Sequence, residues 1–235
     1  MKGVQRVWTI CMNEFKQLFK STKSILTIVI IFILSTFVSS LPFIAAHQEK
    51  WELAKDPYSI GNELVISLFG FFLIFLLSHD ILSREIHLKT IRFLVSKTTR
   101  LNIIIGKYLG LMLFWLSCIM TTYVLNMAIS HRFLFSDALK ILTFISVGIS
   151  CALFLSMLFP TPQKSMFVGM LFSFLFPIAS MISVLSSERM IHWFQYMTPY
   201  YYARWSEPLI YVIMNTALTV ILLIGTALLF QRRDV

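Results

Sequence analysis

Charged side chains are scarce in this sequence. Asp, Glu, Lys and Arg together make up 13% of its 235 residues, whereas soluble domains usually carry about 25%. Apolar residues make up 57%, and Phe alone occurs 22 times. One aqueous core cannot hide that much apolar surface. The composition therefore predicts a protein whose main solvent is lipid, and it excludes a soluble enzyme, a disordered tail and a secreted disulfide scaffold.

Residues that carry chemistry are few and are not spaced for it. The three cysteines lie too far apart for a CxxC motif, and neither HExxH nor GxSxG occurs. The pair Gly106–Lys107 lacks the context of a phosphate loop, because Leu101 stands where that loop needs glycine and Tyr108 where it needs serine or threonine. We therefore expect no catalytic residue, no bound cofactor and no nucleotide site on this chain.

Four possible metal ligands lie close together in the sequence. His79, Asp80, Glu85 and His87 lie within nine residues of one another. A metal site there is conceivable, but the spacing is not a known ligand pattern. A charged, solvated helix start is the preferred interpretation, and we expect no metal.

Long apolar runs dominate the chain. A helix needs about 20 mostly apolar residues to cross a hydrocarbon core of about 30 Å. The period-two polarity of barrel strands is absent, and backbone in lipid must satisfy its own hydrogen bonds, so these runs are expected to be helices. The fold class predicted is an all-α membrane protein with six transmembrane helices in a single domain over 1–235, the spans being 24–46, 60–79, 103–130, 137–159, 164–186 and 208–230.

The positions of lysine and arginine predict the orientation. Fourteen of the 20 fall on one side of the membrane if both termini are placed in the cytoplasm, as the positive-inside rule requires. We therefore expect a multi-pass protein of the cell membrane with cytoplasmic N- and C-termini. The net charge of +9 is then explained by the orientation in the membrane, and no nucleic-acid partner is expected. No span interior holds a charged residue or histidine, which argues against energy taken from a proton gradient.

Three polar segments interrupt the spans. In 1–23, apolar residues from Val4 to Phe19 repeat at helical spacing, which predicts an interfacial amphipathic helix; a plain membrane anchor is favoured over a partner-docking role. The segment 80–102 predicts a second amphipathic helix, which rests on the membrane or docks a soluble partner. The segment 187–207 carries seven aromatic residues. It is either an aromatic belt or a re-entrant helix pair dipping in from outside, and we favour the second interpretation.

Small and polar residues inside the spans suggest how the helices pack. Gly106 and Gly110 form a GxxxG pattern, which lets two helix backbones approach closely. Asn126 and Asn215 cannot easily satisfy their side-chain amides on their own helix. We expect each to tie helices together rather than to line a path.

The segment from Asp80 to Gly110 resembles the loop between the second and third spans of ABC-2 type transporter permeases. That pattern is an Asp closing the second span, a Glu, a Thr starting an amphipathic helix, a Leu-rich turn, an Arg, and a Gly-Lys pair entering the next span. Lys89 stands where glycine often precedes the threonine, and the usual proline before the arginine is missing. The matching residues here are Asp80, Glu85, Thr90, Leu94, Arg100, Gly106 and Lys107.

The resemblance implies the permease subunit of a small bacterial ABC exporter. Such a chain pairs with a second permease chain, identical or not, and docks a cytoplasmic ABC ATPase through a coupling helix at about 82–95. ATP and Mg²⁺ bind to that partner, so this chain is not expected to be an enzyme. We expect a proline at Ile91, or charge reversal at Glu85 or Arg92, to uncouple the ATPase. The residues that the resemblance assigns to coupling are Asp80, Arg84, Glu85, Leu88, Thr90, Ile91, Arg92, Leu94 and Arg100.

The substrate expectation comes from the outer aromatic segment and the uncharged spans. Both favour an amphipathic peptide or drug, held mainly by apolar contact, with a role in antimicrobial peptide export, immunity or resistance. The alternative from another class is a membrane scaffold or sensor subunit that moves nothing and needs no ATPase. The residues expected at the outer gate or in substrate contact are Trp193, Phe194, Tyr201 and Trp205.

Overall fold

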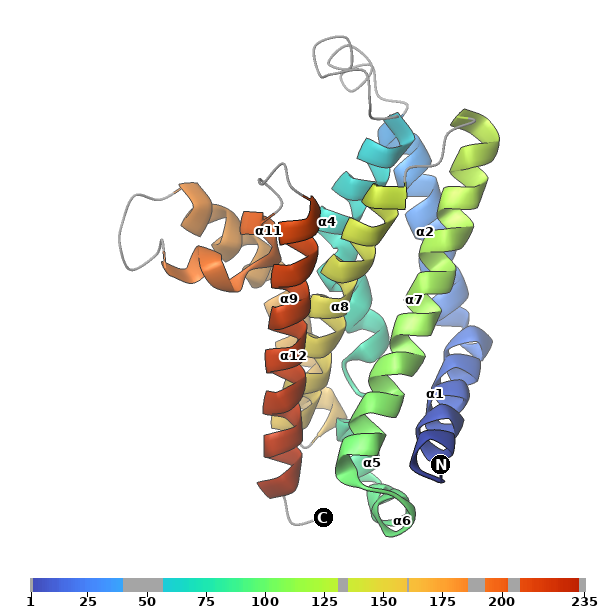
Figure 1. Ribbon diagram of the computed structural model, residues 1–235, viewed down its shortest axis with the longest axis vertical. Coiled ribbons are helices and arrows are strands. Elements are labelled where there is room, and N and C mark those ends of the chain that lie inside the picture. The colour runs from blue at the N-terminus through green and yellow to red at the C-terminus, as the bar shows by residue number, and fades with distance from the viewer. Residues whose placement is uncertain are drawn as a thin grey trace.

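The computed structural model is a bundle of long helices, with two short helices below it and a short helical segment projecting from one side (Figure 1). The structure describes residues 2–39, 57–130, 135–159, 161–185, 193–202 and 208–232. No strand occurs within these ranges, which confirms the all-α prediction. The long helices are α1 (Lys2–Lys20), α2 (Thr22–Ser39), α4 (Pro57–Ser78), α7 (Arg100–Ser130), α8 (Phe135–Leu158), α9 (Pro162–Leu185) and α12 (Pro208–Arg232).

Five of the helical stretches are long and apolar enough to cross a membrane by themselves. Four of them fall within about five residues of the predicted third to sixth spans, and the other, Glu63–His87, begins near the predicted second span, 60–79, but runs eight residues past its end. The first predicted span, 24–46, is described only as far as Ser39, where α2 ends. Residues Ser24–Val38 qualify as a span only together with Gly3–Lys20, to which they are joined at a bend of 70°. The chain is thus a multi-pass membrane protein by its helices, and the count of six spans stays a prediction.

Helix α8 forms the centre of the bundle. It packs against α4, α7, α9 and α12, and it buries 72% of its most apolar stretch, compared with 22% for α9 and 17% for α12. Gly148 lies where α8 and α4 meet, and a Cβ there would lie 2.5 Å from Ile74 Cδ1. Because α9 and α12 bury so little, their apolar faces are free for lipid or another chain.

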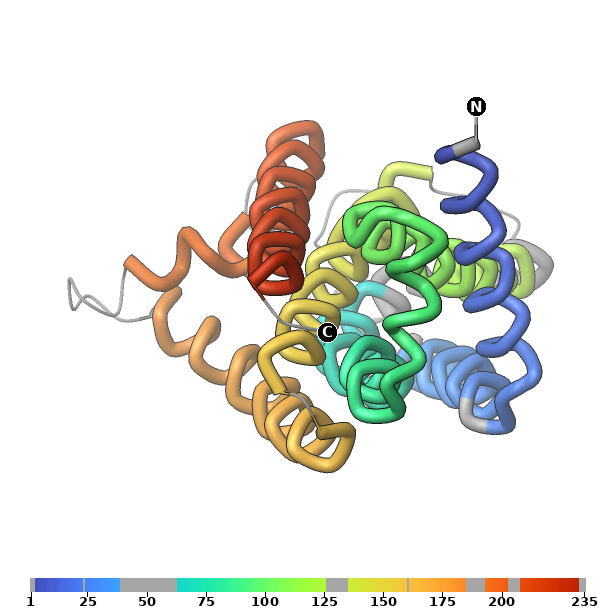
Figure 2. Tube along the Cα trace, turned by 90° about the horizontal axis from the view of Figure 1, so that it is seen from below, coloured from blue at the N-terminus to red at the C-terminus, as the bar shows by residue number. Residues whose placement is uncertain are grey.

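Helix α1 runs across the edge of the bundle rather than along it (Figure 2). Its side chains form three faces. Residues around Cys11 pack on α7, and lysines such as Lys16 and Lys20 lie on a polar face. The third face is apolar and exposed: the side chains of Val4 and Trp8 on it are 76% and 59% exposed. This arrangement is the one expected of an interfacial helix, with the addition that one face is occupied by α7.

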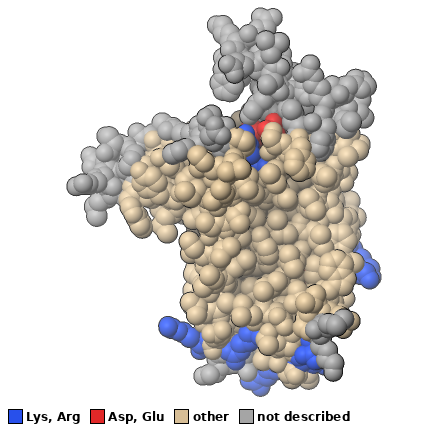
Figure 3. All heavy atoms as spheres, in the orientation of Figure 1, with Lys and Arg blue, Asp and Glu red and all other residues tan. Residues whose placement is uncertain are grey.

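The cations gather at one end of the bundle, below in Figure 3. We call it the basic end. It carries the short helices α5 (Ser83–His87) and α6 (Ile91–Lys97), the start of α7 and the end of α12. The described charges at the opposite end include Glu63, Asp137 and Lys140. The charge asymmetry predicted from the sequence is thus present in the folded chain, and the placement of the basic end in the cytoplasm stays a prediction.

Candidate functional site

The basic end carries a helical hairpin formed by α5 and α6, which we call the coupling hairpin (residues 80–99). The sequence predicted one helix over about 82–95. The structure has two short helices separated at Leu88–Thr90, because Lys89 adopts a left-handed conformation with φ 57°. This conformation ends a helix and costs a residue with a Cβ about 1–2 kcal/mol. Glycine would adopt this conformation without that cost.

The lower face of the coupling hairpin is exposed. Its two large apolar side chains, Leu88 and Phe93, are 58% and 74% exposed. Cations stand beside them on the same short segment, and no acidic residue lies between Ile86 and Lys97. A surface that combines exposed apolar side chains with cations is suited to an apolar groove with an acidic border. The exposed cations are Arg84, Lys89, Arg92 and Lys97.

The opposite face of the coupling hairpin is packed into the protein. Ile91 is completely buried, and Leu94 and Ile86 pack against the same core. Thr90 is exposed and its hydroxyl donates to the Glu85 carbonyl at 3.3 Å. The residues predicted for coupling therefore differ in exposure. Four are exposed, four are half-buried and one is buried: Arg84, Leu88, Thr90 and Arg92; Asp80, Glu85, Leu94 and Arg100; and Ile91.

The position of Ile91 changes one expectation. It is the first residue of α6, with Thr90 as the N-cap. A proline at the first position of a helix is tolerated, because the N–H it removes has no partner within the helix. Proline at Ile91 therefore does not act by breaking a helix; its effect comes from loss of a buried side chain.

A buried lysine joins three separate helices behind the hairpin. The ammonium of Lys107 on α7 lies 2.5 Å from Glu14 Oε1 on α1 and 2.7 Å from Glu85 Oε1 on α5. The lysine is 1% exposed. A lysine so deeply buried needs close carboxylate partners, and removing one partner of a buried pair costs about 3–5 kcal/mol. The cluster therefore holds α1, α5 and α7 in a fixed relation.

A serine of the central helix holds the entry of the coupling hairpin. The backbone N–H groups of Leu82 and Ser83 both donate to Ser156 Oγ on α8, each at 3.0 Å. Leu82 is the N-cap residue of α5, and no side chain of the local segment caps that helix. Ser156 is completely buried. It therefore does from α8 what a Ser or Thr N-cap ordinarily does from the same helix.

An arginine holds the exit of the hairpin. Arg100, the first residue of α7, donates through Nη1 to the carbonyls of Phe230 and Gln231, at 2.7 Å each. Its guanidinium carbon also lies 5.4 Å from the centre of the Phe230 ring. These carbonyls belong to the last turn of α12, where a cation satisfies orphan acceptors and complements the helix dipole.

The predicted glycine contact is present, and its partner is α1. A Cβ at Gly106 would lie 2.9 Å from Ile10 Cβ, and one at Gly110 would lie 2.7 Å from Glu14 Cβ and 2.9 Å from the Cys11 carbonyl oxygen. The two glycines thus let α1 approach the α7 backbone on either side of Lys107.

The structure describes the side chain of only one of the two asparagines expected to tie helices together. Asn126 lies in α7, and its side chain falls outside the described part of the structure. Asn215 is completely buried on α12. One turn further, the hydroxyls of Thr219 and Ser146 lie 2.9 Å apart and join α12 to α8. The polar tie between these helices is therefore a hydroxyl pair next to Asn215.

The outer segment is described over residues 193–202, with a 3₁₀ turn at Gln195–Met197 and α11 (Pro199–Tyr202). It is fastened to the bundle by aromatic contacts. Tyr200 packs on Phe71 and Phe144, and its hydroxyl donates to the Ser67 carbonyl at 2.8 Å. Phe194 packs edge-on against Phe176, with ring centres 6.0 Å apart.

The predicted gate residues therefore occupy different surroundings. Phe194 faces inward, Trp193 is 64% exposed, and Tyr201 packs between Tyr196 and Tyr202. Burial raises the pKa of the Tyr202 phenol, and its hydroxyl donates to the Tyr196 carbonyl at 2.8 Å. Trp205 lies outside the described residues.

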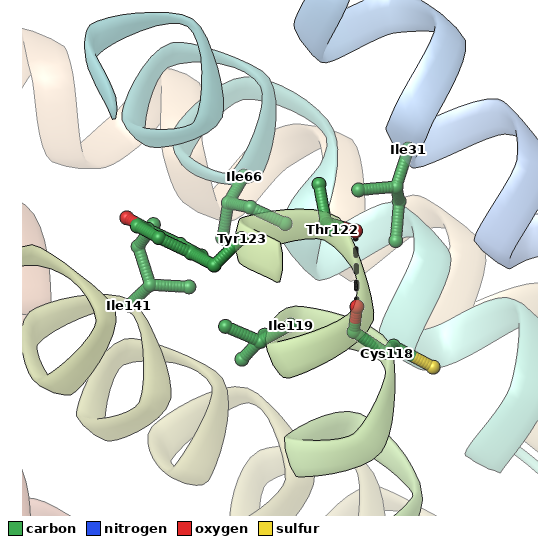
Figure 4. Close-up of a pocket in the computed structure, with 7 residues that line it drawn as sticks. All are labelled: Ile31, Ile66, Cys118, Ile119, Thr122, Tyr123 and Ile141. Atoms are coloured by element: carbon green, nitrogen blue, oxygen red, sulfur yellow. Dashed lines mark hydrogen bonds between the residues drawn. The ribbon is translucent and has the colours of Figure 1, made fainter. Parts of the chain in front are cut away.

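A small cavity lies between α2, α4, α7 and α8 (Figure 4). Its volume is about 10 Å³, room for about one water molecule and far below the roughly 300–1,000 Å³ of small-molecule sites. Among the described residues, no group of three or more His, Cys, Asp or Glu side chains is placed to hold a metal ion. The lining residues are Ile31, Ile66, Cys118, Ile119, Thr122, Tyr123 and Ile141.

Sequence reasoning missed Glu14 and Ser156. Glu14 had a detectable signal, since it is the lone acid in α1 and shares a helix face with Cys11 and Leu18. Ser156 had none, because its role depends on a contact 74 residues away in sequence. No protein-family model matches the chain and no curated protein matches its sequence, so the likeness to ABC-2 type permeases rests on its own residues.

Proposed function

We propose that this chain is the membrane-spanning permease subunit of an ATP-driven ABC exporter. The observation that carries the proposal is the coupling hairpin. It presents Leu88 and Phe93 outward on a segment with four exposed cations. Glu85 ties it to α7, the Leu82 and Ser83 amides tie it to α8, and Arg100, which follows it, ties the start of α7 to α12. A surface that is exposed on one side and rigidly attached on the other can both dock a partner and pass on the partner's movement.

The partner that fits is a soluble ABC ATPase on the cytoplasmic side. Its docking surface would offer an apolar groove for Leu88 and Phe93 and acidic groups for Arg84 and Arg92. ATP and Mg²⁺ belong to that partner, and this chain by itself neither binds nor hydrolyses ATP. A second permease chain completes the transporter, and the little-buried apolar faces of α9 and α12 leave room for it in the lipid bilayer.

The substrate class proposed is an amphipathic peptide or drug. Trp193, Tyr196 and Met197 are exposed beside the bundle, and aromatic and methionine surfaces suit apolar ligands of variable shape. In the long helices other than α1, the described Asp, Glu, Lys and Arg side chains lie towards the helix ends, as Glu63 and Lys140 do, or, in Lys107, are already paired. This leaves apolar contact as the main means of holding a substrate.

One observation favours the alternative, a membrane scaffold or sensor subunit that moves nothing. The cavity between α2, α4, α7 and α8 is too small for a drug or peptide. A transporter whose path runs between two chains would show the same small cavity in one chain. The alternative therefore differs in one testable respect: it needs no ATPase.

Co-expression with a candidate ABC ATPase from the same genome tests the proposal. Phe93→Asp should abolish co-purification of the ATPase and its substrate-stimulated hydrolysis, because it puts a charge at the centre of the docking surface. Val4→Asp is the matched control, since Val4 is equally exposed, at 76%, but lies on α1. Equal co-purification of the two variants, or none with the unaltered chain, would contradict the proposal.

A further inference from the structure

We infer that Ser156 and Arg100 are positioning residues that fasten the coupling hairpin to the α8–α12 pair. The inference rests on the proposed function for its consequence, but its structural part can be tested on the chain alone. A movement of the hairpin then reaches α8 and α12 directly, as well as α4 and α7, to which the hairpin is joined covalently.

The attachment at Ser156 is specific. One hydroxyl accepts two backbone N–H groups, those of Leu82 and Ser83. Neither group can be satisfied within α5, because the first N–H groups of a helix have no partner inside it. Leu82, Ser83 and Ser156 are all completely buried, so water does not replace the hydroxyl without a change of structure.

The attachment at Arg100 is equally directional. A single guanidinium nitrogen donates to two carbonyls at the end of α12, at 2.7 Å each, and the guanidinium carbon lies 5.4 Å from the centre of the Phe230 ring. Lysine at this position keeps the charge but loses the planar guanidinium and its contact with the Phe230 ring. The contact therefore depends on the geometry of arginine and not on its charge alone.

The two receiving helices form one body. α12 packs along α8, and the hydroxyls of Ser146 and Thr219 join them further from the basic end. The entry of the hairpin is held by α8 and its exit by α12. The hairpin is thus fixed at both ends to one pair of packed helices, and a tilt of the hairpin must tilt that pair or break one of the two attachments.

Hydrogen exchange of the purified chain in detergent tests the attachment directly. Ser156→Ala should raise the exchange rates of the Leu82 and Ser83 amides about tenfold or more, since both lose their acceptor. Ser150→Ala is the matched control. Ser150 is also a completely buried serine of α8, but its hydroxyl donates only to the Val147 carbonyl within that helix. Unchanged exchange at Leu82 and Ser83 in Ser156→Ala would overturn the inference.

Functional readouts then separate this inference from the proposed function. In the assembled transporter, Ser156→Ala and Arg100→Lys should keep ATPase binding and lower the amount of substrate exported per ATP hydrolysed by several-fold. Ser156→Thr, which keeps the acceptor, should restore both the exchange rates and the export ratio. If neither Ser156→Ala nor Arg100→Lys changes the ratio although the attachment is loosened, the positioning role is wrong. Failure of the unaltered chain to bind any ATPase instead contradicts the proposed function and leaves the exchange result standing.

Discussion

Gly110 on α7 lies against the backbone of Cys11 on α1, so that a Cβ built on the glycine would stand 2.9 Å from the Cys11 carbonyl oxygen. Backbone cannot yield as a flexible side chain does. The contact makes α1 part of the packed bundle and not a helix attached through lipid alone. It also fixes the register of α1, because Gly106 and Gly110 accept α1 one turn apart.

Gly110→Ala should displace α1 and destabilise the protein by about 1–3 kcal/mol, the usual cost of overpacking. The measurement is thermal unfolding in detergent, together with protease sensitivity of residues 2–20. Gly3→Ala is the control, because its new Cβ meets only Asn102 Nδ2 at 3.9 Å and alanine favours the helix. Equal effects of the two substitutions would contradict the close contact.

Lys107→Met should destabilise the protein by about 3–5 kcal/mol, since it leaves two carboxylates facing each other without their cation. The triple variant Glu14→Gln, Lys107→Met, Glu85→Gln should recover most of this loss, because no uncompensated charge remains. Unfolding free energies in a mutant cycle check the coupling. Additive effects of the three substitutions would show that the ions do not act as a unit.

Lys89→Gly should be neutral or stabilising by about 1 kcal/mol, since glycine adopts the left-handed conformation without the cost of a Cβ. Lys89→Val should destabilise the hairpin, because a β-branched residue strongly disfavours that conformation. Hydrogen exchange over 84–97 is the measurement. A valine variant as protected as the glycine variant would be incompatible with the turn at this position.

Phe194→Ala should loosen the outer segment and lower stability by about 3 kcal/mol at most, because it opens a gap beside Phe176. Tyr200→Phe should cost only about 1 kcal/mol, the net value of its hydrogen bond to Ser67.

Trp193→Ala should leave stability unchanged, since Trp193 is largely exposed, and should reduce export of an amphipathic substrate. Thermal unfolding and transport assays compare the three, and full export by Trp193→Ala would remove that residue from substrate contact.

Much of the helical architecture could be predicted from the sequence. Apolar runs bounded by polar segments locate α4, α7, α8, α9 and α12 to within a few residues, because lipid requires length and apolarity whatever the neighbours are. The break within the coupling hairpin could not be predicted, since Lys89 is no helix breaker by type. Lys89 adopts a left-handed conformation between Ile86 and Ile91, which pack on the same core.

The attachments of the hairpin were also beyond sequence reasoning. Lys107 was expected near the end of a span, but α7 begins at Arg100 and the lysine lies two turns inside it. Its partner Glu14 is 93 residues away, and nothing local indicates the pairing. Contacts between distant segments depend on how helices cross, and the periodicity of one helix does not contain that information.

The order of Lys107 and its two partners along the chain bears on how the protein is made. Glu14 and Glu85 both precede the lysine, so both carboxylates have left the ribosome before the cation that needs them. A lysine entering a bilayer alone is costly to insert. When α7 is inserted, the carboxylates that pair with its lysine are therefore already present on segments synthesised earlier, and the ammonium need not stay unpaired in hydrocarbon.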